Sequence, residues 1–229
     1  MRQFEHATVM DQAESLAMSI GHALELVIKA KGWAVLAVSG GKSPLPMFER
    51  LRYRPIRWDA VTVTLVDERA VPPDHADSNG AMVRNHLLRE GAGVAGWAPL
   101  IRDEAEAADP QRAVARLNAP FHQPDVVVLG MGEDGHTASL FPESPELQAA
   151  LSDPQPGYVV THPGTAPHAR VTLNLAALLA AERTFLAVSG DKKNAVLERA
   201  LAAPTPALPV SVVLARHRRG VDIFRTENT

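Results

Sequence analysis

Four short apolar runs, separated by segments with helical patterns, constrain the fold of this chain more than any other feature. Each run is nearly continuous in aliphatic or β-branched residues, which is typical of strands buried on both faces of a parallel sheet. The runs are WAVLAV (33–38), VTVTLV (61–66), DVVVLG (125–130) and FLAVSG (185–190). The helical patterns between them cover residues 44–51, 78–88, 110–117 and 191–201. Strands that alternate with helices predict an α/β fold, with a parallel-core sheet flanked by helices on both faces.

A helix is expected to open the fold. Apolar residues fall on one helical face between Val9 and Ile28, and Gly32 follows as a C-terminal stop. Near the other end, the proline-containing stretch 203–209 is expected to be a surface loop rather than a linker between domains. The chain is therefore expected to form a single domain over residues 1–229.

Two further segments carry strand character. YVVTH (158–162) and RVTLNL (170–175) lie close together in the sequence, which predicts an antiparallel pair. The segment after Pro209 fits two structures, because VSVVL has strand propensity whereas the preceding proline favours a helix start. The sequence leaves that choice open.

Composition narrows the classes of function. The formal net charge is −3 at pH 7, and the small basic cluster at 216–219 is interpreted as solvated surface, so no nucleic-acid partner is expected. No stretch approaches 18 uninterrupted apolar residues and the N-terminus carries no apolar signal region, so no membrane partner is expected. The absence of cysteine excludes thiol catalysis and thiolate metal sites and fits a reducing compartment. We therefore expect a soluble cytoplasmic protein.

The loop SGGKSP (39–44) directly follows the first apolar run. A nucleotide P-loop needs G-x-x-x-x-G-K-[ST], and the position of its first glycine is held by Leu36, inside the strand, so the nucleotide motif is absent. Gly40 and Gly41 can adopt positive φ angles and let backbone N–H groups converge on a phosphate, with a helix starting at Pro44. The alternative is an ordinary glycine turn without a ligand, and the loop alone does not decide between the two.

The same loop has an echo further along the chain. LAVSGGK (36–42) recurs as LAVSGDK (186–192), and the two agree at six of seven positions. We interpret this as repeated use of one strand-to-loop arrangement rather than as a duplication. Both copies place Ser, Gly and Lys just past the carboxyl end of a strand, where ligands of open α/β sheets bind.

A charged group stands at the carboxyl end of the run at 61–66. Its residues are Asp67–Arg69, with the sequence DER, and such a group beside a buried strand indicates a helix cap or a site. We interpret it as part of a site. His75 and Asp77 follow in a proline-containing loop and are assigned a structural role, with Asp77 or Ser78 as the N-cap of the next helix.

The segment GMGEDGHTAS (130–139) gives the strongest indication of chemistry. Neutral imidazole is the only side chain with an ordinary pKa near working pH, so His136 can take a proton from water if its ring is held in place. Asp134, two residues earlier, can hold that ring and stabilise its protonated form. A structural histidine is the alternative. Thr137 and Ser139 are expected to start a short helix.

Metal binding is the rival use of His136. Zinc sites usually draw on cysteine or on a second histidine three or four residues away, and neither accompanies His136. No metal is expected.

Together these segments resemble the 6-phosphogluconolactonase family. SGGKSP, VDERAVPPDHADSN, GMGEDGHTASLFP, RVTLNLAAL and SGDKKNAVL occur in this order, and the likeness runs from about Val35 to Leu197. The resemblance implies a modified Rossmann-type α/β fold similar to that of the glucosamine-6-phosphate deaminases, without a nucleotide. It also implies hydrolysis of 6-phospho-D-glucono-1,5-lactone in the oxidative pentose phosphate pathway, without a metal or organic cofactor. The expected partner is this small sugar-phosphate lactone, and the expected assembly is a monomer or a small homo-oligomer.

The resemblance also implies a role for individual residues. His136 corresponds to the base that activates water, and Asp134 is its neighbour in the same motif. Asp67 and Arg69 match the family's D-E-R element and are expected to line the pocket. The residues implied to contact the substrate or its phosphate are Gly40, Gly41, Ser43, Arg170 and Lys192.

Two other functions fit parts of the pattern. A sugar-phosphate isomerase or deaminase on the same fold would use a carboxylate such as Asp67 to remove a carbon-bound proton from an opened sugar. DER followed by VPPDH, and ASLFP after the histidine, favour the lactonase. A sugar-phosphate sensor domain of a transcription regulator would share the phosphate loop. It would also bring a helix-turn-helix and a basic face, which the sequence does not show before Val35 or after Leu197.

Overall fold

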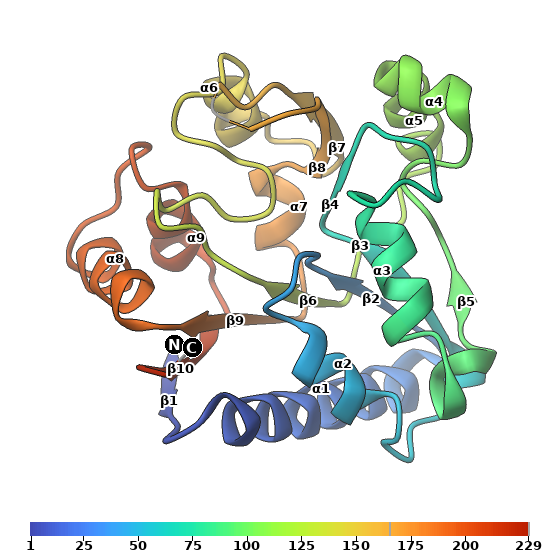
Figure 1. Cartoon of the computed structure of the whole chain (residues 1–229), viewed down its shortest axis with the longest axis vertical. Helices are drawn as coiled ribbons and strands as arrows, with labels where there is room; N and C mark the ends of the chain where they lie inside the picture. The colour runs from blue at the N-terminus through green and yellow to red at the C-terminus, as the bar shows by residue number, and fades with distance from the viewer. Residues whose placement is uncertain (165, 229) are drawn as a thin grey trace.

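Two β-sheets form the centre of the molecule in the computed structural model, which describes residues 1–164 and 166–228 (Figure 1). Within these residues, a seven-stranded parallel sheet has the order β1-β10-β9-β6-β2-β3-β5, and a three-stranded antiparallel sheet has the order β4-β8-β7. The strands are β1 (Arg2–Glu5), β2 (Ala34–Val38), β3 (Val61–Leu65), β4 (Asp67–Arg69), β5 (Gly96–Trp97), β6 (Val126–Leu129), β7 (Tyr158–Thr161), β8 (Arg170–Leu173), β9 (Arg183–Ser189) and β10 (Val221–Thr226).

Helices cover both faces of the parallel sheet. Figure 1 shows α1 and α2 beneath it, and α7 and α9 on the opposite face. The α-helices are α1 (Val9–Lys31), α2 (Leu45–Leu51), α3 (Asn79–His86), α4 (Glu104–Ala108), α5 (Pro110–Leu117), α6 (Leu147–Ser152), α7 (Leu175–Leu179), α8 (Asp191–Ala202) and α9 (Pro209–Arg216). Two short 3₁₀ helices are η1 (Trp58–Ala60) and η2 (Glu90–Val94). This arrangement confirms the predicted α/β class.

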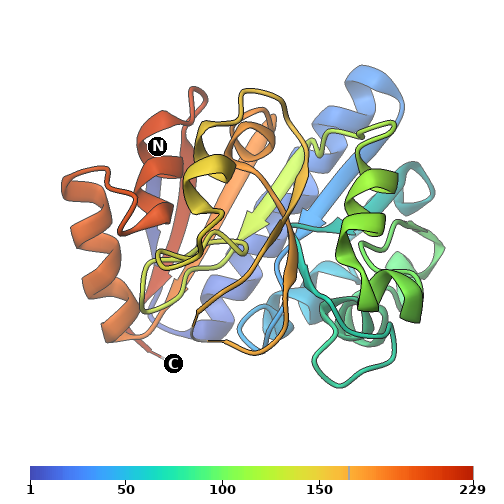
Figure 2. The ribbon, with the colours of Figure 1, turned by 90° about the horizontal axis from the view of Figure 1, so that it is seen from above.

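The four apolar runs are the central strands β2, β3, β6 and β9, as predicted. All residues of β2 and β6 are buried, because helices cover the sheet above and below them. Figure 2 shows β10, β9, β6 and β2 side by side. The carboxyl ends of these parallel strands lie at one edge of the sheet. From β2 the chain proceeds to β3 on one side and later to β6 on the other, which makes the β2–β6 border a topological switch point where ligands bind.

Helix α1 lies where its sequence pattern predicts it, but it does not open the fold, because strand β1 precedes it. The Thr8 side chain accepts a hydrogen bond from the backbone N–H of Asp11 at the N-terminus, and Gly32 ends the helix with a φ of 88°. One residue of its buried face is polar. The amide of Gln12 donates to the carbonyl oxygens of Val188 and Phe224, at 2.8 Å each. The polar group thus ties α1 to the ends of β9 and β10 instead of being left unsatisfied.

Other sequence predictions have mixed outcomes. The antiparallel pair is confirmed as β7 and β8. The ambiguous segment after Pro209 is helix α9, with the proline in its first turn.

The short helix predicted from Thr137 is wrong, because residues 137–140 form a tight turn closed by a bridge between Thr137 and Leu140. The Thr137 hydroxyl donates back to the Gly130 carbonyl oxygen at 2.8 Å, and Ala138 has a φ of 49°. The positive φ of Ala138 is incompatible with a right-handed helix at this point. In the described part of the chain, no helix combines the length and apolar character that a membrane span requires.

Candidate active site

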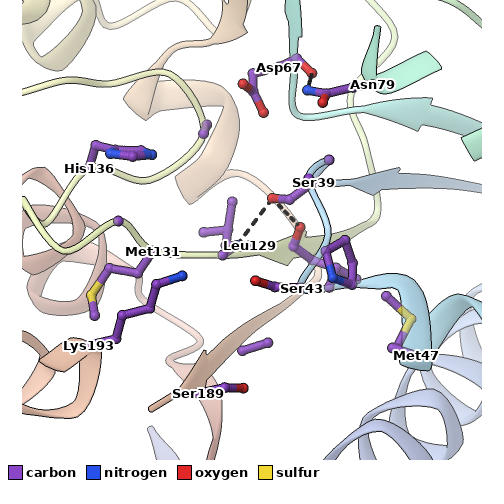
Figure 3. Close-up of a pocket in the computed structure, with 18 of the residues that line it drawn as sticks. Ser39, Ser43, Met47, Asp67, Asn79, Leu129, Met131, His136, Ser189 and Lys193 are labelled. Atoms are coloured by element: carbon purple, nitrogen blue, oxygen red, sulfur yellow. Dashed lines mark hydrogen bonds between the residues drawn. The ribbon is translucent and has the colours of Figure 1, made fainter. Parts of the chain in front are cut away.

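A cavity of about 280 Å³ lies at the carboxyl edge of the parallel sheet, over the β2–β6 border (Figure 3). Its floor and apolar side come from α1 and from the ends of β6 and β9. Its polar side comes from the loops that follow β2, β3 and β6. The predicted site residues that line it are Gly40, Gly41, Ser43, Asp67, Arg69, His136 and Arg170. Segments that are far apart in the sequence therefore meet at this edge, as the strand order requires.

The glycine loop after β2 forms one wall. Gly41 has a φ of 86°, in the left-handed region that favours glycine. Gly40 does not have a positive φ, and it needs to be glycine for another reason. A Cβ at Gly40 would overlap the side-chain amide of Asn79, which packs against this loop. The Ser39 hydroxyl donates to the Val128 carbonyl oxygen at 3.0 Å, which holds the loop next to β6.

The loop after β6 presents His136 to the cavity. Figure 3 shows the imidazole extending into the open space opposite Ser39 and Ser43. Its Nδ1 lies 2.6 Å from Oδ1 of Asp134, and the same oxygen accepts the backbone N–H of His136 at 3.1 Å. The ring also packs on Phe141, with centroids 4.2 Å apart. Because Nδ1 is engaged by the carboxylate, Nε2 is the nitrogen that can meet a ligand.

Asp134 does not itself line the cavity, but it is in direct contact with the ring that does. Partial burial raises the pKa of Asp134, and the hydrogen bonds from the ring and the backbone N–H of His136 outweigh this, so that the pKa lies below its ordinary value. The pairing with the imidazole therefore favours the ionised form of Asp134.

Two glycines shape this loop. A Cβ at Gly132 would overlap both the His136 ring and the Asp134 carboxylate, so only glycine leaves room for the pair. Gly135 has a φ of 79°, and its carbonyl oxygen accepts the backbone N–H of Val210 at 3.1 Å. The loop is thus fixed against the start of α9.

The D-E-R element after β3 contributes to the cavity through its first and third residues. Asp67 is buried, and its Oδ2 accepts a hydrogen bond from the Ser139 hydroxyl at 2.6 Å. Arg69 lines the cavity, and its Nη1 donates to the backbone carbonyl oxygen of Asp77 at 2.6 Å. Alternation along β4 turns the second residue, Glu68, to the other side of the strand.

Glu68 has a structural role, the helix-cap alternative that the sequence left for the D-E-R group, and it does not line the cavity. It is 3% exposed and accepts the backbone N–H groups of Asn79 and Gly80, at 2.8 and 2.6 Å, and the hydroxyl of Ser78 at 3.0 Å. Burial raises the pKa of Glu68, and these hydrogen bonds offset part of the rise. The carboxylate joins β4 to the N-terminus of α3. Of the two predicted caps, Ser78 is the one that accepts a helix N–H, from Ala81.

Arg170 reaches the cavity from the start of β8. It is 5% exposed, and its Nη1 donates to the carbonyl oxygens of Pro167 and His168, at 2.8 and 3.3 Å. Burial lowers the pKa of Arg170, and the charge of Arg69 lowers it further. Two guanidinium groups that line the same cavity favour an anionic ligand.

The structure does not bring Lys192 to the cavity. Its side chain is 82% exposed, and its Nζ lies 3.9 Å from the carboxylate of Glu133. The next residue, Lys193, lines the cavity instead, and Figure 3 shows its Nζ pointing into the open space near Met131 and Ser43. Lys192 and Lys193 are in the first turn of α8, where successive side chains point about 100° apart.

Sequence reasoning also missed Asn79 and Ser139. The buried amide of Asn79 donates to the Asp67 carbonyl oxygen at 3.0 Å while it packs on Gly40. Asn79 and Ser139 touch predicted site residues through contacts between distant segments, which no local pattern encodes. Among the described residues there is no group of three His, Cys, Asp or Glu side chains arranged to hold a metal ion.

Comparisons with known proteins agree with one another. Residues 7–222 match the family described as glucosamine-6-phosphate isomerases/6-phosphogluconolactonase. A 6-phosphogluconolactonase from Neisseria meningitidis is 40% identical over 227 residues, which cover 97% of this chain and 98% of that protein.

Solved structures extend the comparison to the fold. The crystal structure of a 6-phosphogluconolactonase from Shewanella baltica has a TM-score of 0.92 and 38% identity, with coverage of 99% of this chain and 97% of the other. The structure of a monomeric glucosamine-6-phosphate deaminase has a TM-score of 0.76 and 17% identity, with coverage of 99% of this chain and 97% of the deaminase chain. The two proteins therefore share the fold. With its fold and its sequence in agreement, this chain belongs to the glucosamine-6-phosphate isomerase/6-phosphogluconolactonase family.

Proposed function

We propose that this protein hydrolyses 6-phospho-D-glucono-1,5-lactone to 6-phosphogluconate. The observation that carries the proposal is the imidazole of His136, which faces the cavity while its Nδ1 is held by Asp134. A carboxylate on Nδ1 fixes the tautomer that leaves a lone pair on Nε2, the atom a general base needs. The names of the relatives from Neisseria and Shewanella support the lactone as substrate.

The substrate's phosphate is held at the polar side of the cavity. In our proposal the backbone of the Gly40–Gly41 loop and the Ser43 hydroxyl donate to it, and Arg170 and Lys193 supply the balancing charge. Lys193 takes the role that the sequence assigned to Lys192, because Lys193 is the lysine that reaches the cavity. Hydrogen bonds between charged groups contribute about 1.5–3 kcal/mol each, enough to fix the orientation of a small ligand.

With the phosphate held, the lactone carbonyl carbon C1 is set beside His136. Nε2 removes a proton from a water molecule as the water oxygen attacks C1. The negative charge that develops on the carbonyl oxygen is stabilised by Arg69. When the tetrahedral intermediate collapses, the bond between C1 and the ring oxygen breaks, and the protonated His136 returns its proton to that oxygen.

Asp134 and Asp67 have different parts in this scheme. Asp134 orients the imidazole and stabilises its protonated form during the reaction, which is consistent with its lowered pKa. Asp67 lines the cavity with one oxygen engaged by Ser139, and its other oxygen can accept a hydroxyl of the substrate. Both roles are filled by side chains of the protein itself.

The proposal is tested by adding purified protein to freshly prepared 6-phosphogluconolactone and following the formation of 6-phosphogluconate with a coupled dehydrogenase. Spontaneous opening of the lactone is measured in a matched blank and subtracted. We expect hydrolysis well above the blank and no ammonia release from glucosamine 6-phosphate. Ammonia release without lactone hydrolysis would instead identify the deaminase reaction.

A further inference from the structure

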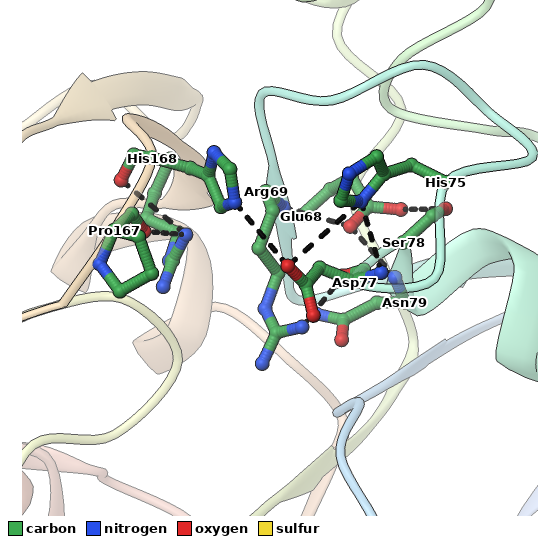
Figure 4. Close-up of polar contacts among 9 residues, drawn as sticks. Glu68, Arg69, His75, Asp77, Ser78, Asn79, Pro167 and His168 are labelled. Carbon is green, nitrogen blue, oxygen red and sulfur yellow. Dashed lines mark hydrogen bonds and ion pairs between the residues drawn. The ribbon is translucent and has the colours of Figure 1, made fainter.

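Three titratable residues outside the proposed reaction lie beside the two arginines of the cavity (Figure 4). His75 and Asp77 come from the loop between β4 and α3, and His168 comes from the loop between β7 and β8. Figure 4 shows the Asp77 carboxylate between the two imidazoles. In the described part of the chain, none of the three is among the residues that line the cavity. They stand where the two loops meet.

His168, rather than His75, is the imidazole that pairs with Asp77. The backbone N–H of Asp77 donates to Nδ1 of His75 at 3.1 Å, which requires a lone pair on that nitrogen. This nitrogen therefore has no proton to give to the Asp77 carboxylate, 3.8 Å away. Nε2 of His168 lies 3.3 Å from Oδ2 of Asp77, within hydrogen-bonding distance. The side-chain hydrogen bond between the two loops is thus made by Asp77 and His168. It adds to a main-chain hydrogen bond from the Ala70 N–H to the Ala169 carbonyl oxygen at 2.9 Å.

The loop that carries His168 also carries the partners of Arg170. Nη1 of Arg170 donates to the carbonyl oxygens of Pro167 and His168, at 2.8 and 3.3 Å. Both hydrogen bonds go to the main chain, so the position of this guanidinium depends on the backbone of the loop. His168 itself has a φ of 69°, a conformation that non-glycine residues adopt only where their surroundings hold them.

The loop that carries Asp77 is fixed independently of His168. The backbone N–H of Ser78 donates to the His75 carbonyl oxygen, and that of His75 donates to the Pro72 carbonyl oxygen, both at 2.9 Å. Ser78 is in turn bonded to the buried Glu68. The position of Asp77 is therefore set by its own loop, and its contact with His168 restrains the position of His168.

We propose that Asp77 and His168 are positioning residues for Arg170. Their contact holds the backbone at Pro167 and His168, whose carbonyl oxygens place the Arg170 guanidinium against the cavity. In the described structure both hydrogen bonds of this guanidinium use Nη1, which leaves Nη2 and Nε for an anion in the cavity. The inference rests on the proposed function, in which Arg170 binds the substrate's phosphate.

The experiment compares three variants, Asp77→Asn, His168→Asn and His75→Asn, with the wild-type protein. We expect Asp77→Asn and His168→Asn each to raise KM for 6-phosphogluconolactone about tenfold and to leave kcat within about threefold. His75→Asn is the matched control. It removes an imidazole that accepts the Asp77 N–H and packs edge-on against the His168 ring, with centroids 5.7 Å apart, but that donates no hydrogen bond to the Asp77 carboxylate. Its KM is expected to stay within about twofold. Thermal unfolding of each variant checks that it is folded.

The double variant Asp77→Asn/His168→Asn tests whether the two residues act through one contact. Its KM should be close to that of either single variant rather than the product of the two effects. Independent effects that multiply to about a hundredfold would overturn the proposal. So would an unchanged KM in both single variants, or an equal rise in His75→Asn.

Binding of 6-phosphogluconate, measured by calorimetry, separates this proposal from the proposed function. If the wild type binds 6-phosphogluconate without hydrolysing the lactone, the proposed reaction fails, and weaker binding by the two variants still supports the positioning role. If the wild type hydrolyses the lactone but the variants bind as tightly as it does, the positioning role fails alone. A wild type that binds no 6-phosphogluconate would overturn both.

Discussion

Nδ1 of His136 and Oδ1 of Asp134 lie 2.6 Å apart on a single tight loop, with only Gly135 between the two residues in sequence. The pair therefore does not depend on the docking of two distant segments. The position of the pair in the cavity depends on such docking, because Gly135 hydrogen-bonds the loop to α9 and Thr137 hydrogen-bonds it to the end of β6. The His136–Asp134 pair comes from one short stretch of sequence, whereas the cavity around it is built from segments that are distant in sequence.

Replacement of His136 by Ala should lower kcat by about 10²–10⁴, the usual contribution of a positioned general base. The fold should persist, since the ring is part of a surface loop and is 30% exposed. Steady-state kinetics on the lactone measure the effect. His22→Ala, on the exposed face of α1, is the control and should retain wild-type turnover. Full turnover in His136→Ala would refute the assignment of the base.

Asp134→Asn keeps the size of the side chain but removes the charge that stabilises a protonated ring. We expect kcat to fall by about 10², less than the ~10⁴ seen in fully buried triads, because water can reach this partly exposed pair. KM should change little. Equal losses in kcat and in binding of 6-phosphogluconate would show that Asp134 serves the binding site instead.

Neighbouring lysines provide a matched test of the phosphate site. Lys193→Ala should raise KM about tenfold or more, since a charge-assisted hydrogen bond to phosphate contributes about 1.5–3 kcal/mol. Lys192→Ala should have little effect, because this exposed side chain points toward Glu133. Michaelis constants of the two variants decide between the lysines. A larger rise in KM for Lys192→Ala than for Lys193→Ala would instead identify Lys192 as the phosphate ligand.

A methyl group at Gly132 should disable the catalytic pair without unfolding the protein. Gly132→Ala places a Cβ where the His136 ring and the Asp134 carboxylate now lie, so the ring must move, and a displacement of about 1 Å can cost ~10² in rate. Gly130→Ala is the control in the same loop, because a Cβ there meets nothing within 4 Å. Similar kcat values for the two variants would contradict the packing argument.

Stability at low pH should depend on Glu146. Burial raises its pKa, but hydrogen bonds from Ser144 and from the ring and backbone of His162 outweigh this and lower the pKa to about 2. A lowered folded-state pKa stabilises the protein above the ordinary value of 4.5, and this stabilisation is lost as the pH falls from there toward about 2.

The corresponding variant is Glu146→Gln. At pH 7 it should reduce the free energy of unfolding by about 1 kcal/mol, a value discounted for the solvent exposure of the pair. The difference from wild type should shrink below pH 4.5. Urea titrations at pH 7 and pH 3 measure it, and a difference that does not depend on pH would argue against an ionised Glu146.

The sequence predicted the central strands well because full burial on both faces leaves an unbroken apolar signature. It predicted the His136–Asp134 pair for a similar reason, since both residues belong to one short loop. The segment after Pro209 was undecided, because its β-branched residues have strand propensity while packing against α8 and α7 decides for a helix.

The errors have physical causes of the same kind. The repeat LAVSG aligns Lys192 with Lys42, yet in the described structure neither lysine lines the cavity. The direction of Lys193 depends on where α8 begins, which the repeat does not encode. Thr137 and Ser139 look like helix starters, but their hydroxyls bond to Gly130 and to the distant Asp67. Partners contributed by other segments decided each of these positions.

Segments from early and late in the chain build the cavity, with Gln12 of α1 on one wall and Lys193 of α8 on another. A fragment that lacks α1 or α8 would lose part of the ligand-binding surface even if the remaining strands stayed paired. Enzymatic turnover should therefore disappear in step with the main cooperative transition in a denaturant titration, so that an activity assay doubles as a probe of global folding.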